Sequence, residues 1–253
     1  MVISFAAISC LMSLPATFRA IMLASIAVTI IPARADTSAP ALTLSQILDQ
    51  MERHNQHQAE GLKRYKAVRH YQAEYQGYGS DIVGKMEVEV KFDASSGKSF
   101  QILSQSGSKL LCDKVLKKAV DSEKEASKNP AVTALTPANY KFELIGSEIL
   151  NGRPSYVLKV DPLKKTKFLY QGQIWVDATD FAVAKIEAAP AKNPSFWIST
   201  TMIRYSNSKT GDFWLPHQTR SETKVRVGGT AVLTIDYGTY NINPDTPPEP
   251  ATD

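Results

Sequence analysis

Two stretches of the chain alternate between apolar and polar residues, which is typical of β-strands with one buried face. In Lys85–Phe92 the even positions are apolar and the odd positions are charged, and Ser155–Asp161 shows a similar alternation. Because successive side chains of a strand point to opposite faces, each apolar set shares one face, which we expect to point inward. The residues expected to form an inner, ligand-binding apolar surface are Met86, Val88, Val90, Tyr156, Leu158 and Val160.

The segment Lys141–Ala189 is predicted to be an antiparallel meander. Asn151-Gly152 separates two apolar-polar alternating runs, and this dipeptide favours a tight hairpin turn with positive φ at both residues. A second turn is predicted at Asp177–Asp180, because Asp side chains accept hydrogen bonds from nearby backbone N–H groups. Two carboxylates could also serve acid–base chemistry, but we interpret Asp177 and Asp180 as exposed turn residues.

Two segments have a helical rather than a strand period. One begins near Thr43 or Ser45, either of which could cap it, and the other is Leu110–Lys128, which ends before Pro130. The rest of the pattern predicts about ten strands. A helix with an apolar face must bury that face, and the sheet formed by these strands is the surface available for it. We therefore predict the α+β class: a strongly curved, half-open antiparallel β-barrel of about ten strands, with helices packed on its concave face.

Residues 1–35 are expected to be a signal peptide. Ile21–Ile31 is an apolar run too short to span a bilayer, and Ala33-Arg34-Ala35 fits a small-x-small cleavage site. An uncleaved anchor helix is the alternative. We therefore predict export to the periplasm, one domain over residues 36–243, and a disordered tail over the proline-rich residues 244–253.

Charge argues against nucleic acid as a partner. The 253 residues carry a net charge of +4, and removal of the signal peptide with its two arginines brings the mature chain closer to neutrality. Binding to nucleic acid requires a dense basic face, which this composition does not favour. We expect a monomeric protein without a nucleic-acid partner.

Candidate chemistry is sparse. Cys112 is the single cysteine after the signal peptide, so it has no partner for an internal disulfide, and we interpret it as a packing residue rather than a nucleophile. His54 and His57 could share a helix face, but two histidines without a third ligand make a weak metal site, and a solvated helix surface is the favoured reading. The chain lacks the common nucleophile, phosphate-loop and zinc motifs. We expect no enzyme activity, no cofactor and no metal.

The strand and turn pattern also carries a family resemblance. The runs GSEILNGRPSYVLKVDP, GQIWVDATDFAVAKIEA, DFWLPHQTRSETKVRV and TIDYGTYNIN occur in this order within Leu44–Asn243. In order and spacing they resemble outer-membrane lipoprotein-sorting proteins of the LolA/LolB-like superfamily, which includes RseB-like half-barrels. These motifs describe strands and turns, so no functional residue of the family is carried over to this chain.

The resemblance implies a periplasmic carrier or chaperone whose groove shields lipid-modified or other apolar cargo without catalysis. Its partners would be lipoprotein acyl chains or other lipid, together with an inner- or outer-membrane protein. The alternative is a sensor or scaffold module of the same fold that binds a membrane-protein partner. Phe196-Trp197, after a proline-rich loop, is read as core or as the entrance of the groove, with core favoured.

Overall fold

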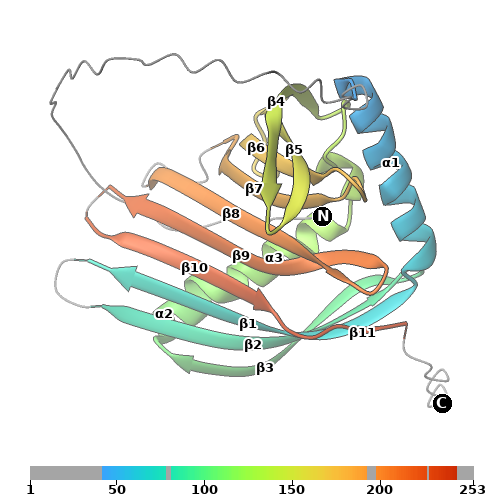
Figure 1. The fold of residues 1–253 in the computed structure, drawn as a ribbon. Coiled ribbons are helices and arrows are strands. Elements are labelled where there is room, and N and C mark those ends of the chain that lie inside the picture. The colour runs from blue at the N-terminus through green and yellow to red at the C-terminus, as the bar shows by residue number, and fades with distance from the viewer. Residues whose placement is uncertain (1–41, 78–80, 193–197, 227, 244–253) are drawn as a thin grey trace, which may run out of the picture.

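A computed structural model describes residues 42–77, 81–192, 198–226 and 228–243 (Figure 1). The predicted signal peptide, the predicted C-terminal tail and Phe196-Trp197 lie outside the described residues, so the expectations for them stay predictions. The helical elements are α1 (Leu44–Gly61), α2 (Lys109–Leu111), the π-helical turn η1 (Cys112–Leu116), α3 (Lys117–Ser127) and the 3₁₀ turn η2 (Pro130–Val132). The strands are β1 (Arg64–Gln76), β2 (Ile82–Asp93), β3 (Gly97–Gly107), β4 (Tyr140–Leu150), β5 (Arg153–Pro162), β6 (Tyr170–Asp177), β7 (Val183–Pro190), β8 (Ile198–Thr210), β9 (Phe213–Val225), β10 (Thr230–Tyr237) and β11 (Asn241–Ile242).

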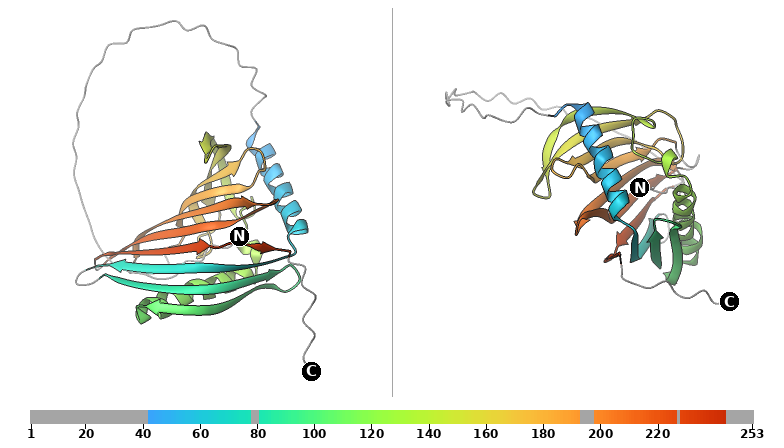
Figure 2. Two further views of the ribbon diagram at one scale, coloured as in Figure 1. Left: turned by 60° about the horizontal axis from the view of Figure 1, so that its bottom comes forward. Right: turned by 90° about the vertical axis from the view of Figure 1, so that its right-hand side faces the viewer.

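The described strands form one antiparallel sheet that does not close. Its order is β3-β2-β1-β10-β9-β8-β7-β6-β5-β4, with the short β11 paired to β1. Within the described residues β3 and β4 are the two edges, and the sheet between them is strongly curved (Figures 1 and 2). The predicted α+β fold, a half-open antiparallel barrel, is confirmed.

Local sequence signals explain where the elements begin and turn. The Thr43 side chain caps α1 by accepting from the backbone N–H of Gln46 at 3.3 Å, and the Gln46 side chain accepts from the Thr43 N–H at 2.8 Å. Asn151 and Gly152 have φ values of 51° and 78°, as the predicted hairpin turn between β4 and β5 requires. The meander β4-β5-β6-β7 is also as predicted.

Helices cover one face of the sheet at two separate places. Ile47 and Met51 of α1 pack into a cluster built mainly from β4 to β8. The continuous helical segment from α2 through η1 to α3 packs against β1 and β2, in a second cluster. The helices are thus divided between the two halves of the sheet, one over each half (Figure 2).

The approach of α2 to β2 depends on Gly84. A Cβ atom at this position would lie 2.9 Å from the Leu111 Cβ and 3.3 Å from the Ser108 carbonyl oxygen. We expect Gly84→Val to lower the free energy of unfolding by about 1–3 kcal/mol, because the helix must move to admit the side chain. Thermal unfolding measures this; Lys85→Val, at the exposed neighbouring position, is the control, and equal midpoints for the two variants would contradict the close packing.

Candidate ligand-binding face

A row of side chains crosses the helix-covered face of the sheet from β2 to the edge strand β4. Directly paired residues of antiparallel strands share a face, so the strand register identifies its members. Eight of the nine are buried, and eight are apolar or aromatic. We call it the central row: Met86, Tyr71, Ile235, Thr219, Tyr205, Ile186, Ile174, Leu158 and Leu144.

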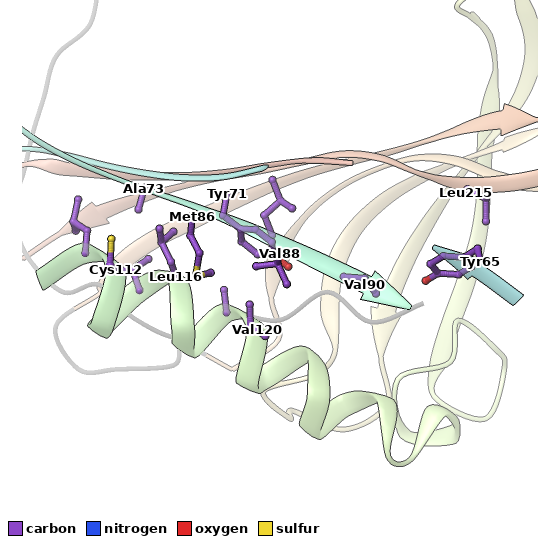
Figure 3. Close-up of a cluster of buried hydrophobic side chains, with 14 of the residues drawn as sticks. Tyr65, Tyr71, Ala73, Met86, Val88, Val90, Cys112, Leu116, Val120 and Leu215 are labelled. Carbon is purple, nitrogen blue, oxygen red and sulfur yellow. The ribbon is translucent and has the colours of Figure 1, made fainter. Parts of the chain in front are cut away.

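The first half of the predicted apolar surface lies under the α2–α3 segment. Met86, Val88 and Val90 are fully buried and point from β2 toward the helix (Figure 3). On the helix, Leu116 and Val120 face them. These three positions are therefore inward-facing, as the alternation predicted.

The second half lies in the other cluster. Leu158 and Val160 are fully buried among residues of β6, β7 and α1. Tyr156 is half-buried and stacks on Phe181, with ring centroids 6.4 Å apart. The two predicted sets thus share the concave face but belong to two clusters, each under its own helix, rather than to one contiguous patch.

A buried ion-pair cluster lies between β1, β3 and α3. Arg69 Nη1 donates to Glu123 Oε2 at 2.7 Å, and Lys98 Nζ donates to Glu123 Oε1 at 3.1 Å. The Arg69 side chain is 0% exposed, that of Glu123 is 8% and that of Lys98 is 21%. This cluster attaches α3 to the sheet by charge as well as by apolar packing.

The negative charge of Glu123 and the positive charges of Arg69 and Lys98 stabilise each other's ionised forms. Burial alone would raise the pKa of Glu123, but the positive charges of Lys98 and Arg69 outweigh it and the net pKa is lowered. Burial likewise acts to lower the pKa of Arg69, and the Glu123 carboxylate more than offsets it, so the net pKa is raised well above its ordinary value. All three groups are therefore charged at neutral pH.

Aromatic rings surround the Arg69 guanidinium. Its central carbon lies 4.6 Å from the ring centroid of Tyr237 and 5.9 Å from that of Phe100. The Tyr237 hydroxyl is in turn 3.2 Å from that of Thr219 in the central row. Such cation–π contacts favour a desolvated cation.

Some hydrogen-bonding capacity of the cluster is unused. Arg69 Nε, Arg69 Nη2 and the Tyr71 hydroxyl are buried and have no hydrogen-bond partner in the described structure. Tyr71 is the second residue after Arg69 on the same face of β1, so the three groups belong to one patch. Buried polar groups without partners are rare in folded proteins and call for an explanation.

The sequence carries a partial signal for this cluster. Arg69 alternates in register with Ala67, Tyr71 and Ala73, which places a charge on the apolar face of β1. Glu123 lies in the mostly polar rear half of the predicted helix Leu110–Lys128, yet it follows Val120 at helical spacing and is buried. The two residues are 54 positions apart, so no local pattern pairs them.

The prediction for the turn at Asp177–Asp180 is partly wrong. The turn role is confirmed, because Asp177 Oδ1 accepts from the backbone N–H groups of Thr179 at 3.0 Å and Asp180 at 2.8 Å. Asp177 is fully buried rather than exposed, and its Oδ1 also accepts from Arg153 Nη2 at 2.8 Å. Burial acts to raise the pKa of Asp177, but hydrogen bonds from Arg153 and the turn N–H groups lower it overall.

The remaining candidate residues have packing or surface roles. Cys112 is a buried free cysteine whose Sγ lies 3.5 Å from the Ser106 carbonyl oxygen, in line with the predicted packing role. Burial lowers the pKa of His54 on α1. Within the described ranges, no group of three or more His, Cys, Asp or Glu side chains is placed to hold a metal ion, and none of the helices there is long and apolar enough to cross a membrane.

Comparison with known proteins gives similarity at the level of structure. No family model and no curated protein matches the sequence. A domain from Vibrio parahaemolyticus described as an outer membrane lipoprotein-sorting protein is 11% identical, with a TM-score of 0.44, over 79% of this chain and 94% of that one. A LolA superfamily protein from Nitrosomonas europaea is 14% identical, with a TM-score of 0.37, over 82% of this chain and 96% of that one.

A third similar structure is the MucA/MucB complex of Pseudomonas aeruginosa, at 11% identity and a TM-score of 0.27, over 75% of this chain and 94% of that one. At such scores the similarity concerns the fold, and functional conclusions rest on the residues described above. The class of protein named in these similarities, lipoprotein-sorting and LolA-like, is the one to which the strand and turn motifs were compared.

Proposed function

We propose that this protein is a periplasmic carrier or chaperone that binds lipid-modified or other apolar cargo on the concave face of its sheet, without catalysis. The observation that carries this proposal is the central row, an almost wholly apolar line that crosses nine strands of an open sheet. Two separate helical segments cover this row, and a cover made of helices can move where a closed barrel could not. The proposed lining includes Met86, Val88, Val90, Tyr156, Leu158 and Val160.

The α1 helix is the cover that we expect to move first. Within α1 only Ile47 and Met51 are fully buried, whereas the α2–α3 segment buries seven apolar side chains and Glu123. Burial of an acyl chain of about sixteen carbons contributes roughly 12 kcal/mol in gross terms, at about 0.8 kcal/mol per methylene. Much of this is offset by ordering the ligand and displacing the helix, so a reversible affinity is expected.

A carrier exchanges cargo with membranes, and this property tests the proposal. The purified protein should move a fluorescent lipid from donor to acceptor vesicles at a rate that rises with protein concentration, and organic extraction of protein prepared without detergent should recover lipid. Heat-unfolded protein at equal concentration is the control. No transfer above this control, together with no extracted lipid, would contradict a carrier role.

The second candidate is a sensor or scaffold module that binds a membrane-protein partner. It is favoured by the edge strand β4, which has a single strand neighbour among the described residues and exposes Ile145 and Ile149, the latter 68% exposed. An exposed apolar edge is suited to strand addition by a partner. Tight binding of one envelope protein that is lost in Ile149→Lys, with no lipid transfer, would favour this function over the carrier.

A further inference from the structure

The unused hydrogen-bonding capacity at Arg69 has a specific shape. An arginine presents five N–H donors in a planar fork, and the described structure uses Nη1 alone, for Glu123. The unpartnered Nε and Nη2 form one edge of the guanidinium, with their N–H groups side by side. This edge matches the paired oxygens of a carboxylate or a phosphate.

A third donor lies beside this edge. The Tyr71 hydroxyl is buried without a hydrogen-bond partner. Tyr71 is two residues after Arg69, so its side chain lies on the same face of β1. The two side chains are also close to each other: burial raises the pKa of Tyr71, and the positive charge of Arg69 and its N–H groups near the hydroxyl oxygen oppose that increase. The N–H groups on the free edge of Arg69 and the O–H group of Tyr71 are therefore available as donors to one ligand.

The charge of the cluster is unbalanced. Arg69 and Lys98 are positive and Glu123 is the carboxylate between them, so the cluster has an excess of one positive charge. A buried excess charge is unfavourable unless a counter-charge compensates it. An anion on the free edge of Arg69 would supply that charge without displacing Glu123 from Nη1.

The surroundings indicate what the anion is attached to. Val88 and Tyr237 are the strand partners of Arg69 on either side, and the central row begins at the adjacent Met86–Tyr71 pair. From β1 to β7 the row crosses four strand spacings, roughly 19 Å at about 4.8 Å each, which suits an extended chain of about sixteen carbons. The ligand class that fits is a long-chain amphiphile with a single anionic head.

We propose that the Nε–Nη2 edge of Arg69 and the Tyr71 hydroxyl bind the carboxylate or phosphate head of the cargo, while its acyl chain follows the central row toward α1. This inference rests on the proposed carrier function and adds the head-group class to it. It also gives Arg69 two separate roles: Nη1 attaches α3 through Glu123, and the opposite edge recognises the ligand.

The test compares three ligands of equal chain length and different heads. Hexadecanoic acid, hexadecyl phosphate and hexadecanol are titrated against the delipidated protein below their aggregation limits, by displacement of a fluorescent fatty acid. Inorganic phosphate is the fourth ligand. We expect at least one of the two anionic amphiphiles to bind about 10-fold or more tightly than the alcohol, because charge-assisted hydrogen bonds are the stronger ones. The acid and the phosphate then tell which head the site prefers.

Three variants test which residues cause the preference for anionic amphiphiles over the alcohol. Tyr71→Phe removes a hydroxyl that has no partner, so it should leave the thermal midpoint within a few degrees of wild type and reduce the anion preference several-fold. The double variant Arg69→Met with Glu123→Leu removes the guanidinium and its carboxylate together, leaves the partly exposed Lys98 as the remaining charge, and should remove most of the preference. The matched control is Tyr75→Phe, on the same face of β1, whose hydroxyl donates to the Gly228 carbonyl oxygen at 2.8 Å and which should retain the preference.

Each outcome is decisive. Equal binding of the alcohol and both anions to wild type, or a preference that is undiminished in the double variant, would overturn the head-group site and leave the carrier function standing. Binding of inorganic phosphate as tightly as hexadecyl phosphate would overturn the assignment to an amphiphile. Failure of all three amphiphiles to bind would overturn the proposed function, and the head-group site with it.

Discussion

Glu123→Leu should destabilise the protein by about 3–5 kcal/mol, because it leaves Arg69 buried without its carboxylate partner. In a domain of this size that corresponds to a fall of roughly 6–20 °C in the thermal midpoint. Chemical denaturation measures the loss of unfolding free energy directly. The apolar packing of α3 remains, so the fold class should be retained at low temperature.

Two further variants separate the buried pair from a general effect of removing an acid from α3. Glu125 lies on the same helix and pairs with Lys167 at 2.7 Å, but both side chains are about half exposed. Glu125→Leu should therefore change stability by less than about 1 kcal/mol. Combining Glu123→Leu with Arg69→Met should recover most of the loss, since an apolar pair can replace a buried ion pair. A Glu123→Leu variant as stable as Glu125→Leu would contradict the structural role of the pair.

The contribution of Glu123 depends on pH in a defined direction. Its pKa is lowered in the folded protein, because Lys98 and Arg69 outweigh the effect of burial. A carboxyl whose folded pKa lies below the unfolded value of about 4.3 contributes its full stability above that value and loses it as the pH falls through the folded pKa. The difference in unfolding free energy between wild type and Glu123→Leu should thus be constant from neutral pH to about pH 5 and shrink below about pH 4.

Leu158→Ala is the second substitution with a large expected effect. Leu158 is fully buried in the central row, in the cluster that α1 covers, and its truncation should lower the unfolding free energy by about 2–5 kcal/mol. Leu144 is its direct partner on the edge strand β4 and is 36% exposed. The matched variant Leu144→Ala should lower it by no more than about 1 kcal/mol.

Ligand binding should also differ between these two variants if the acyl chain reaches the cluster that α1 covers. Leu158→Ala should weaken binding of a fluorescent fatty acid, and Leu144→Ala, at the exposed end of the central row, should weaken it less. Equal stability losses in both variants would contradict the assignment of the concave face as the packed face of the sheet.

Local patterns predicted the strands and their faces. The alternation at Met86, Val88 and Val90 gave the inward face of β2, and Asn151-Gly152 gave the turn between β4 and β5. Side-chain alternation along a strand and φ preference in a turn are set within a few residues, so the sequence shows them directly. For the same reason Thr43 could be named as one of two caps of α1.

Long-range relations were not accessible from the pattern. Because β1 pairs with β10 in the sheet, the predicted apolar sets of β2 and β5 lie on opposite halves of one face. Which helix covers which half is decided by tertiary packing. The burial of Asp177 depends on Arg153, 24 residues away across a strand pair. The pairing of Arg69 with Glu123 depends on the docking of α3, which no strand or helix period encodes.

The most direct test of the central claim is the location of a bound acyl chain. A hexadecanoic acid that carries a photoreactive diazirine near its tail is bound to the purified protein, irradiated, and its attachment sites are mapped by mass spectrometry. We expect labels on inward-facing residues of the central row and the two clusters, such as Ile174, Ile186 and Leu158. Labels confined to the outward face, at residues such as Lys85 and Lys159, or no labelling above that of unfolded protein, would contradict the account.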